Sequence, residues 1–77
     1  MAFDVHIIDE EGSGIEGVRV CLGFTSILRG MTTEETTDSG GHAEFDGYKD
    51  GEVQVFLDGS SYGNDWYADG AGITITK

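Results

Sequence analysis

Val18-Arg19-Val20-Cys21-Leu22-Gly23-Phe24 is the clearest structural signal in this chain of 77 residues. Its large apolar side chains recur at every second position, and the residues between them are Arg19, Cys21 and Gly23. Successive side chains of a β-strand point to opposite faces of a sheet, so this period of two predicts a strand with one face in a core.

The same alternation recurs on both sides of this stretch. Short alternating segments begin at Phe3, Ala43, Val53 and Ile73, and the polar, β-branched residues 32–37 are typical of an exposed edge strand. Residues 60–72 fit either a further strand around 62–67 or an aromatic loop. The predicted core residues are Val5, Ile7, Val18, Val20, Leu22, Phe45, Val55, Leu57, Ile73 and Ile75.

Glycine alone separates these segments, because the chain has 13 glycines and no proline. Asp-Gly pairs at 46–47, 58–59 and 69–70 are typical of tight turns, in which glycine supplies a positive φ at little cost. No helical period of useful length is present. The predicted fold class is all-β: a single antiparallel two-sheet sandwich of six to seven short strands, transthyretin-like or Ig-like, with residues 1–77 as one domain.

Acidic residues dominate the charge of the chain. Fifteen Asp and Glu face four Lys and Arg, which gives a net charge of −11. Such a surface repels phosphate, so we expect neither a nucleic acid nor an anionic membrane as partner. A solubilising surface, halophilic adaptation and cation binding are three explanations that the composition leaves open.

Cysteine content and hydropathy limit the remaining classes. Cys21 is the only cysteine, so no disulfide forms within the chain. No apolar run approaches the roughly 20 residues that a membrane span needs, and we expect no membrane insertion. Neither a basic nor an apolar signal-peptide region follows Met1. The compartment stays open, because a domain of a larger secreted protein would lack such a signal too.

Several motifs occur in an order that resembles carboxypeptidase regulatory-like domains. Val5-x-Ile7-x-Asp9 precedes Gly14-Ile15-x-Gly17-Val18-x-Val20, and Thr37-Asp38-Ser39-Gly40-Gly41-x-Ala43-x-Phe45 follows. Val53-x-Val55 comes next, with Gly59 and Tyr62 a few residues on. The resemblance covers roughly residues 5–62. It implies a transthyretin-like (prealbumin-like) sandwich, related in fold to Cna-B-like domains, that acts as an accessory or interaction module beside other domains.

One enzyme of the transthyretin-like superfamily, hydroxyisourate hydrolase, supplies an alternative. His6-Ile7-Ile8-Asp9 is similar to its "H-V-L-D" motif, and histidine is the usual proton-transfer group near neutral pH. Two departures count against it. The enzyme's C-terminal "Y-R-G-S" signature is absent, and His42 stands where the enzyme has an arginine. We therefore predict no catalytic residue, and keep a hydrolase that uses His6 as the alternative.

We predict no cofactor and no metal. His6, Cys21 and His42 could hold zinc only if they shared one sheet, and no CxxC or HxxxH spacing supports this. Asn64-Asp65 and Asp69-Gly70 lack the spacing of a calcium loop.

The predicted binding residues are apolar side chains at surface positions. Ile8, Cys21 and Phe56 occupy the polar side of their strands and would form a patch if those strands were neighbours. Tyr62, Trp66 and Tyr67 could serve as interface anchors or sugar platforms, although we expect at least one of Tyr62 and Trp66 to pack in the core. The predicted binding set is Ile8, Phe56, Trp66 and Tyr67. The predicted function is a non-catalytic module that binds a protein or carbohydrate, or acts as a spacer.

Overall fold

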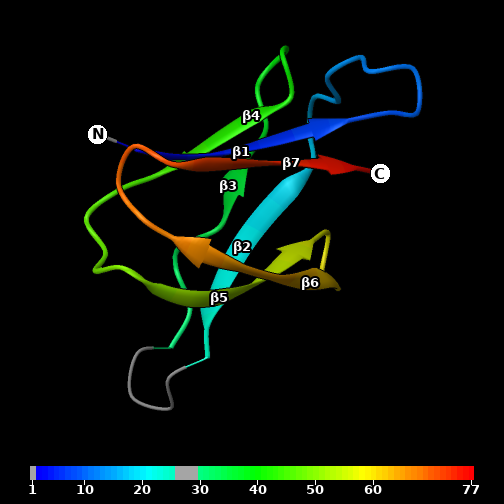
Figure 1. Cartoon of the computed structure of the whole chain (residues 1–77). Helices are drawn as coiled ribbons and strands as arrows, with labels where there is room; N and C mark the ends of the chain where they lie inside the picture. The colour runs from blue at the N-terminus through cyan, green and yellow to red at the C-terminus, as the bar shows by residue number, and fades with distance from the viewer. Residues whose placement is uncertain (1, 26–29) are drawn as a thin grey trace.

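The structure is a computed structural model that describes residues 2–25 and 30–77. The described residues form strands and turns without a helix, so they offer no helical segment that could cross a membrane. The seven strands, shown in Figure 1, are β1 (Phe3–Ile8), β2 (Arg19–Phe24), β3 (Glu35–Thr36), β4 (His42–Phe45), β5 (Gly51–Leu57), β6 (Ser60–Tyr67) and β7 (Gly72–Thr76).

The strands form two sheets. Sheet A has three strands in the order β4-β1-β7, and sheet B has four in the order β3-β2-β5-β6. The all-β prediction is confirmed, and β6 settles residues 60–67 as a strand. The prediction of wholly antiparallel pairing is wrong at one place, because β7 runs parallel to β1. The chain reaches β7 from sheet B, so β7 is not joined to β1 by a hairpin that would reverse its direction.

Buried side chains from both sheets form one hydrophobic core. Eight of the ten predicted core residues are buried, and the other two, Ile73 and Ile75, are half-buried and pack against the same cluster. The alternation of β1, β2 and β5 accounts for this result, because their outward positions are all less buried than their inward ones. The buried apolar residues are Phe3, Val5, Ile7, Val18, Val20, Leu22, Phe24, Ala43, Phe45, Val53, Val55, Leu57 and Tyr67.

Tyr67 fills one end of the core. Its ring centroid lies 5.1 Å from that of Phe3 and 5.8 Å from those of Phe24 and Tyr48. Its hydroxyl donates to the carbonyl oxygen of Phe45 at 3.3 Å, so the polar end of this buried side chain is satisfied. Burial raises the pKa of the Tyr67 phenol. The side chain thus contacts residues of both sheets.

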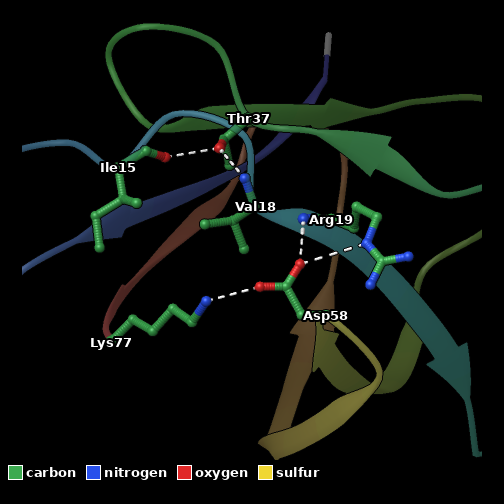
Figure 2. A network of polar contacts seen from close by, with 6 residues as sticks. All are labelled: Ile15, Val18, Arg19, Thr37, Asp58 and Lys77. Atoms are coloured by element: carbon green, nitrogen blue, oxygen red, sulfur yellow. Dashed lines mark hydrogen bonds and ion pairs between the residues drawn. The ribbon is translucent and has the colours of Figure 1, made fainter.

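Thr37 attaches the segment before β4 to the start of β2. Its buried hydroxyl donates to the carbonyl oxygen of Ile15 at 2.6 Å and accepts from the backbone N–H of Val18 at 2.9 Å (Figure 2). The backbone N–H of Thr37 also donates to the carbonyl of Val18 at 2.9 Å. A β-branched residue with a hydroxyl therefore satisfies backbone groups that lie outside the strand pairings.

Asp58 connects the last residue of the chain to sheet B. Asp58 and Gly59 both have positive φ, 50° and 86°, as a two-residue hairpin turn between β5 and β6 requires. The Asp58 carboxylate accepts from Lys77 Nζ at 2.7 Å and from the backbone N–H of Arg19 at 3.1 Å (Figure 2). These donors, Lys77 first, lower the pKa of Asp58 to about 2.

We expect Asp58→Asn to lower the melting temperature near pH 6, although asparagine tolerates the positive φ of the turn. The folded pKa of Asp58 is depressed, so its contribution is present above the unfolded value of 3.8 and is lost as the pH falls through about 2. The difference in melting temperature between the parent and the variant should therefore shrink as the pH falls over this range. Thermal melts in a pH series measure it.

Glu11→Gln is the matched control, because Glu11 is an exposed acid in the β1–β2 turn and its loss changes the net charge equally. It should not lower the melting temperature. A deficit in Asp58→Asn that stays constant down to pH 2 would contradict the role of the carboxylate charge.

Candidate functional site

The outer face of sheet B carries an apolar patch around Gly23. Cys21 lies directly opposite Phe56 on the neighbouring strand, and Met31 lies opposite Gly23 on the other side of β2. A Cβ atom added to Gly23 would lie 3.0 Å from the Phe56 ring and 3.8 Å from the Met31 side chain. Phe56 and Met31 thus lie against the backbone that Gly23 leaves open. We call Cys21, Met31 and Phe56 the sheet-B patch.

Trp66 lies on the same face, on the edge strand β6. It lies opposite Glu52 in β5. Glu52 precedes buried Val53, so its side chain points away from the core, as that of Phe56 does. The Trp66 side chain is 57% exposed and Met31 is 58% exposed. Large apolar side chains with this exposure on one sheet face are typical of a contact surface.

Polar side chains lie between Trp66 and the sheet-B patch. Gln54 is opposite Asn64, and its amide Nε2 donates to the hydroxyl of Ser61 at 2.6 Å. This face therefore combines exposed aromatic and apolar groups with side-chain donors and acceptors. Such a combination can accept a protein surface or a sugar.

Two of the predicted binding residues lie elsewhere. Tyr67 is fully buried, so its assignment to a binding surface is wrong: its neighbour Trp66 takes the outward position, and alternation turns Tyr67 inward. Ile8 belongs to β1 of sheet A, so it does not share a patch with Cys21 and Phe56. The expectation that Tyr62 or Trp66 packs in the core is also wrong, because both are exposed.

Met31 is a surface residue that the sequence did not single out. The available signal was Gly23, because a glycine inside a strand often marks the close approach of another group. The strand alternation gave no information on Met31, which lies outside the named strands and forms an isolated bridge with Gly23.

The outer face of sheet A carries a second cluster, of two histidines and an aspartate. His6 and His42 are cross-strand partners, and their rings stack with centroids 4.0 Å apart and planes 6° from parallel. His42 Nδ1 donates to the Asp4 carboxylate at 2.9 Å, and His6 Nε2 donates to the Gly40 carbonyl at 3.0 Å. The two imidazoles are thus held by different acceptors.

Charge around this cluster favours protonated His42. Its hydrogen bond to Asp4 raises the pKa of His42, and the nearby charges of Asp38 and Glu44 add to this effect. The pKa of Asp38 is lowered, chiefly because its carboxylate accepts from the backbone N–H of His42. His42 can therefore carry a proton on the solvent-exposed face of sheet A.

The structure separates the residues considered for zinc. Cys21 lies in sheet B, whereas His6 and His42 lie in sheet A. Among residues 2–25 and 30–77, no three His, Cys, Asp or Glu side chains are arranged to hold a metal ion, and no pocket is present. No protein-family model and no curated protein matches the chain.

We expect Asp4→Asn to lower the pKa of His42, because the variant loses the carboxylate that accepts from Nδ1. The folded pKa of His42 lies above the unfolded value of 6.5, so its stabilisation is present below that value and is lost as the pH rises through the folded pKa. The variant should therefore lose more stability near pH 5 than near pH 8.

An NMR titration of the His42 ring protons measures the pKa directly, and thermal melts at the two pH values measure the stability. Glu10→Gln, in the β1–β2 turn, removes one acidic charge away from the cluster and is the control. An unchanged pKa of His42 in Asp4→Asn would contradict the pairing.

Proposed function

We propose that this chain is a non-catalytic interaction module of the transthyretin-like or Ig-like sandwich type, resembling carboxypeptidase regulatory-like domains. Two observations support the sandwich. Side chains of both sheets share one core, and Tyr67 contacts residues of sheet A and of sheet B. Its binding surface is the outer face of sheet B, where it contacts a protein or a carbohydrate.

The exposure of Trp66 is the observation that carries this proposal. Tryptophan is among the side chains that contribute most to binding when a partner covers them. In this chain the core accepts the adjacent Tyr67 and leaves Trp66 in solvent, on the same face as Phe56 and Met31. A spacer domain gains nothing from aromatic groups gathered on one face, whereas a binding module does.

The alternative, a transthyretin-related hydrolase that uses His6, is favoured by the stacking of His6 on His42 beside Asp4. A hydrolase needs His6 to act across a cleft together with a second polar group. In the structure the His6 Nε2 proton is engaged by the Gly40 carbonyl, and the described residues enclose no pocket. These observations support the non-catalytic proposal.

The proposal predicts that Trp66→Ala and Phe56→Ala each weaken binding of the partner by at least about 30-fold, which corresponds to the roughly 2 kcal/mol of a hot-spot residue. Trp66→Ala should leave the melting temperature unchanged, because the side chain is exposed. The parent and the variants are titrated against one panel of soluble polysaccharides and folded proteins. NMR shift changes then locate the contact.

Ile8→Ala is the matched control, because Ile8 is a half-buried apolar residue on the outer face of the other sheet. It should leave binding unchanged. A partner that binds Trp66→Ala and Phe56→Ala as tightly as the parent would contradict the proposed surface, and turnover of a ureide that is lost in His6→Ala would favour the hydrolase.

A further inference from the structure

The two sheets differ by one strand, and the difference lies at one side. β3 and β4 follow each other in the chain and contact each other across the sheets. Sheet A ends at β7, whereas sheet B continues beyond β5 to β6. The Lys77–Asp58 ion pair at 2.7 Å joins the end of β7 to the turn between β5 and β6.

Sheet A covers little of β6. Residues Ser60 to Trp66 are all exposed, and only Tyr67 is buried. In β7, Ile73 and Ile75 point toward the core but are only half-buried. β7 is thus an exposed edge of sheet A, and β6 is an exposed edge of sheet B. We call the free edge of β7, together with the exposed inner face of β6, the β7 slot.

The backbone of β7 directs free hydrogen-bonding groups into the slot. Asp4 N–H donates to Ala71 O at 3.1 Å, and Lys77 N–H donates to Ile8 O at 2.9 Å. In a parallel pair of strands, every second residue directs both its N–H and its C=O to the same neighbouring strand. The odd-numbered residues of β7 therefore form their backbone hydrogen bonds with β1. The N–H and C=O groups of Gly72, Thr74 and Thr76 therefore face away from β1.

The other sheet edges carry features that hinder the addition of a strand. β3 has two residues, and β4 has four, with His42 and Glu44 on its outer side. β6 has a register shift opposite Gln54 and Phe56, and Gly63 has a φ of 105°. The sequence of β7, Gly-Ile-Thr-Ile-Thr, has no charge, proline or bulge. Short length, charges and bulges are the devices that block edge pairing, so β7 is the open edge.

Asp65, on the inner side of β6, favours an occupant with a positive charge. Asp65 is directly opposite buried Val53, so its side chain lies on the inner side of β6. Its carboxylate accepts from the backbone N–H of Trp66, and no ion pair to it occurs in the described part of the chain. With a net charge of −11 on the chain, a basic segment is attracted and an acidic one is repelled.

A second copy of this chain is disfavoured as the occupant. Each copy carries a net charge of −11, so two copies repel each other. We propose that an extended, basic segment of a partner protein adds to sheet A as a fourth strand beside β7, with apolar side chains on Ile73 and Ile75 and a lysine or arginine near Asp65.

The probe is a capped peptide of about nine residues, a usual strand length, with threonine alternating with valine and lysine. A second peptide has glutamate in place of lysine, and a third has a central proline. In the free protein the amides of Ile73 and Ile75 should exchange slowly with solvent, whereas those of Thr74 and Thr76 exchange fast. The lysine peptide should slow Thr74 and Thr76 at least tenfold, and the other two peptides should not.

Two variants test the residues of the slot. Thr74→Pro removes an N–H that makes no bond to β1, so it should abolish peptide binding while Ile73 and Ile75 stay protected. Asp65→Asn should weaken binding of the lysine peptide several-fold. Glu11→Gln, which changes the net charge equally outside the slot, should leave it unchanged, and so should Phe56→Ala, which alters only the proposed sheet-B surface.

Three results would overturn the proposal. Slow exchange of Thr74 and Thr76 in the free protein at low concentration would mean that the edge is already covered. Protection of these amides that rises with protein concentration, alongside dimers in sedimentation, would make a second copy the occupant. Equal effects of the lysine and proline peptides would exclude strand addition. The sheet-B surface is separate, so each proposal can fail without the other.

Discussion

The side chain of Tyr67 determines how this small fold presents its surface. Its ring packs against Phe3 of sheet A and Phe24 of sheet B, and its hydroxyl reaches the carbonyl of Phe45. A chain of this size buries only about 60% of its unfolded surface, so one large side chain that contacts both sheets matters. Because neighbours in a strand point to opposite faces, placing Tyr67 inside places Trp66 outside.

The exposure of the rest of β6 follows from the fact that Tyr67 is its only buried residue. The strand pairs with β5 along its length, but only Tyr67 enters the core. At the other end of β6, the Asp58-Gly59 turn and the ion pair from Lys77 hold the hairpin near the end of β7. The middle of β6 is therefore exposed on both faces. One face displays Trp66 on the same side of sheet B as the sheet-B patch, and the other forms part of the β7 slot.

The sequence was most informative where alternation and burial coincide. The period of two identified the buried positions of β1, β2 and β5, and the Asp-Gly pair at 58–59 identified a turn. It failed for Tyr67, because residues 60–67 contain polar residues on both sides and Gly63 interrupts the alternation. It also failed for the parallel pairing of β7 and for the sheet that contains Ile8. Strand neighbours are set by long-range packing, which a local period does not report.

The surface described above depends on the register of β6, because a slip of one residue would exchange Trp66 and Tyr67 between surface and core. Trp66 is the only tryptophan, so the intrinsic fluorescence of the folded chain reports on this residue alone. Acrylamide, a neutral quencher, avoids repulsion by the acidic surface. We expect an emission maximum close to that of the unfolded chain, and quenching in the folded state nearly as efficient as in denaturant. A blue-shifted emission that acrylamide quenches poorly until the chain unfolds would place Trp66 in the core and contradict the account.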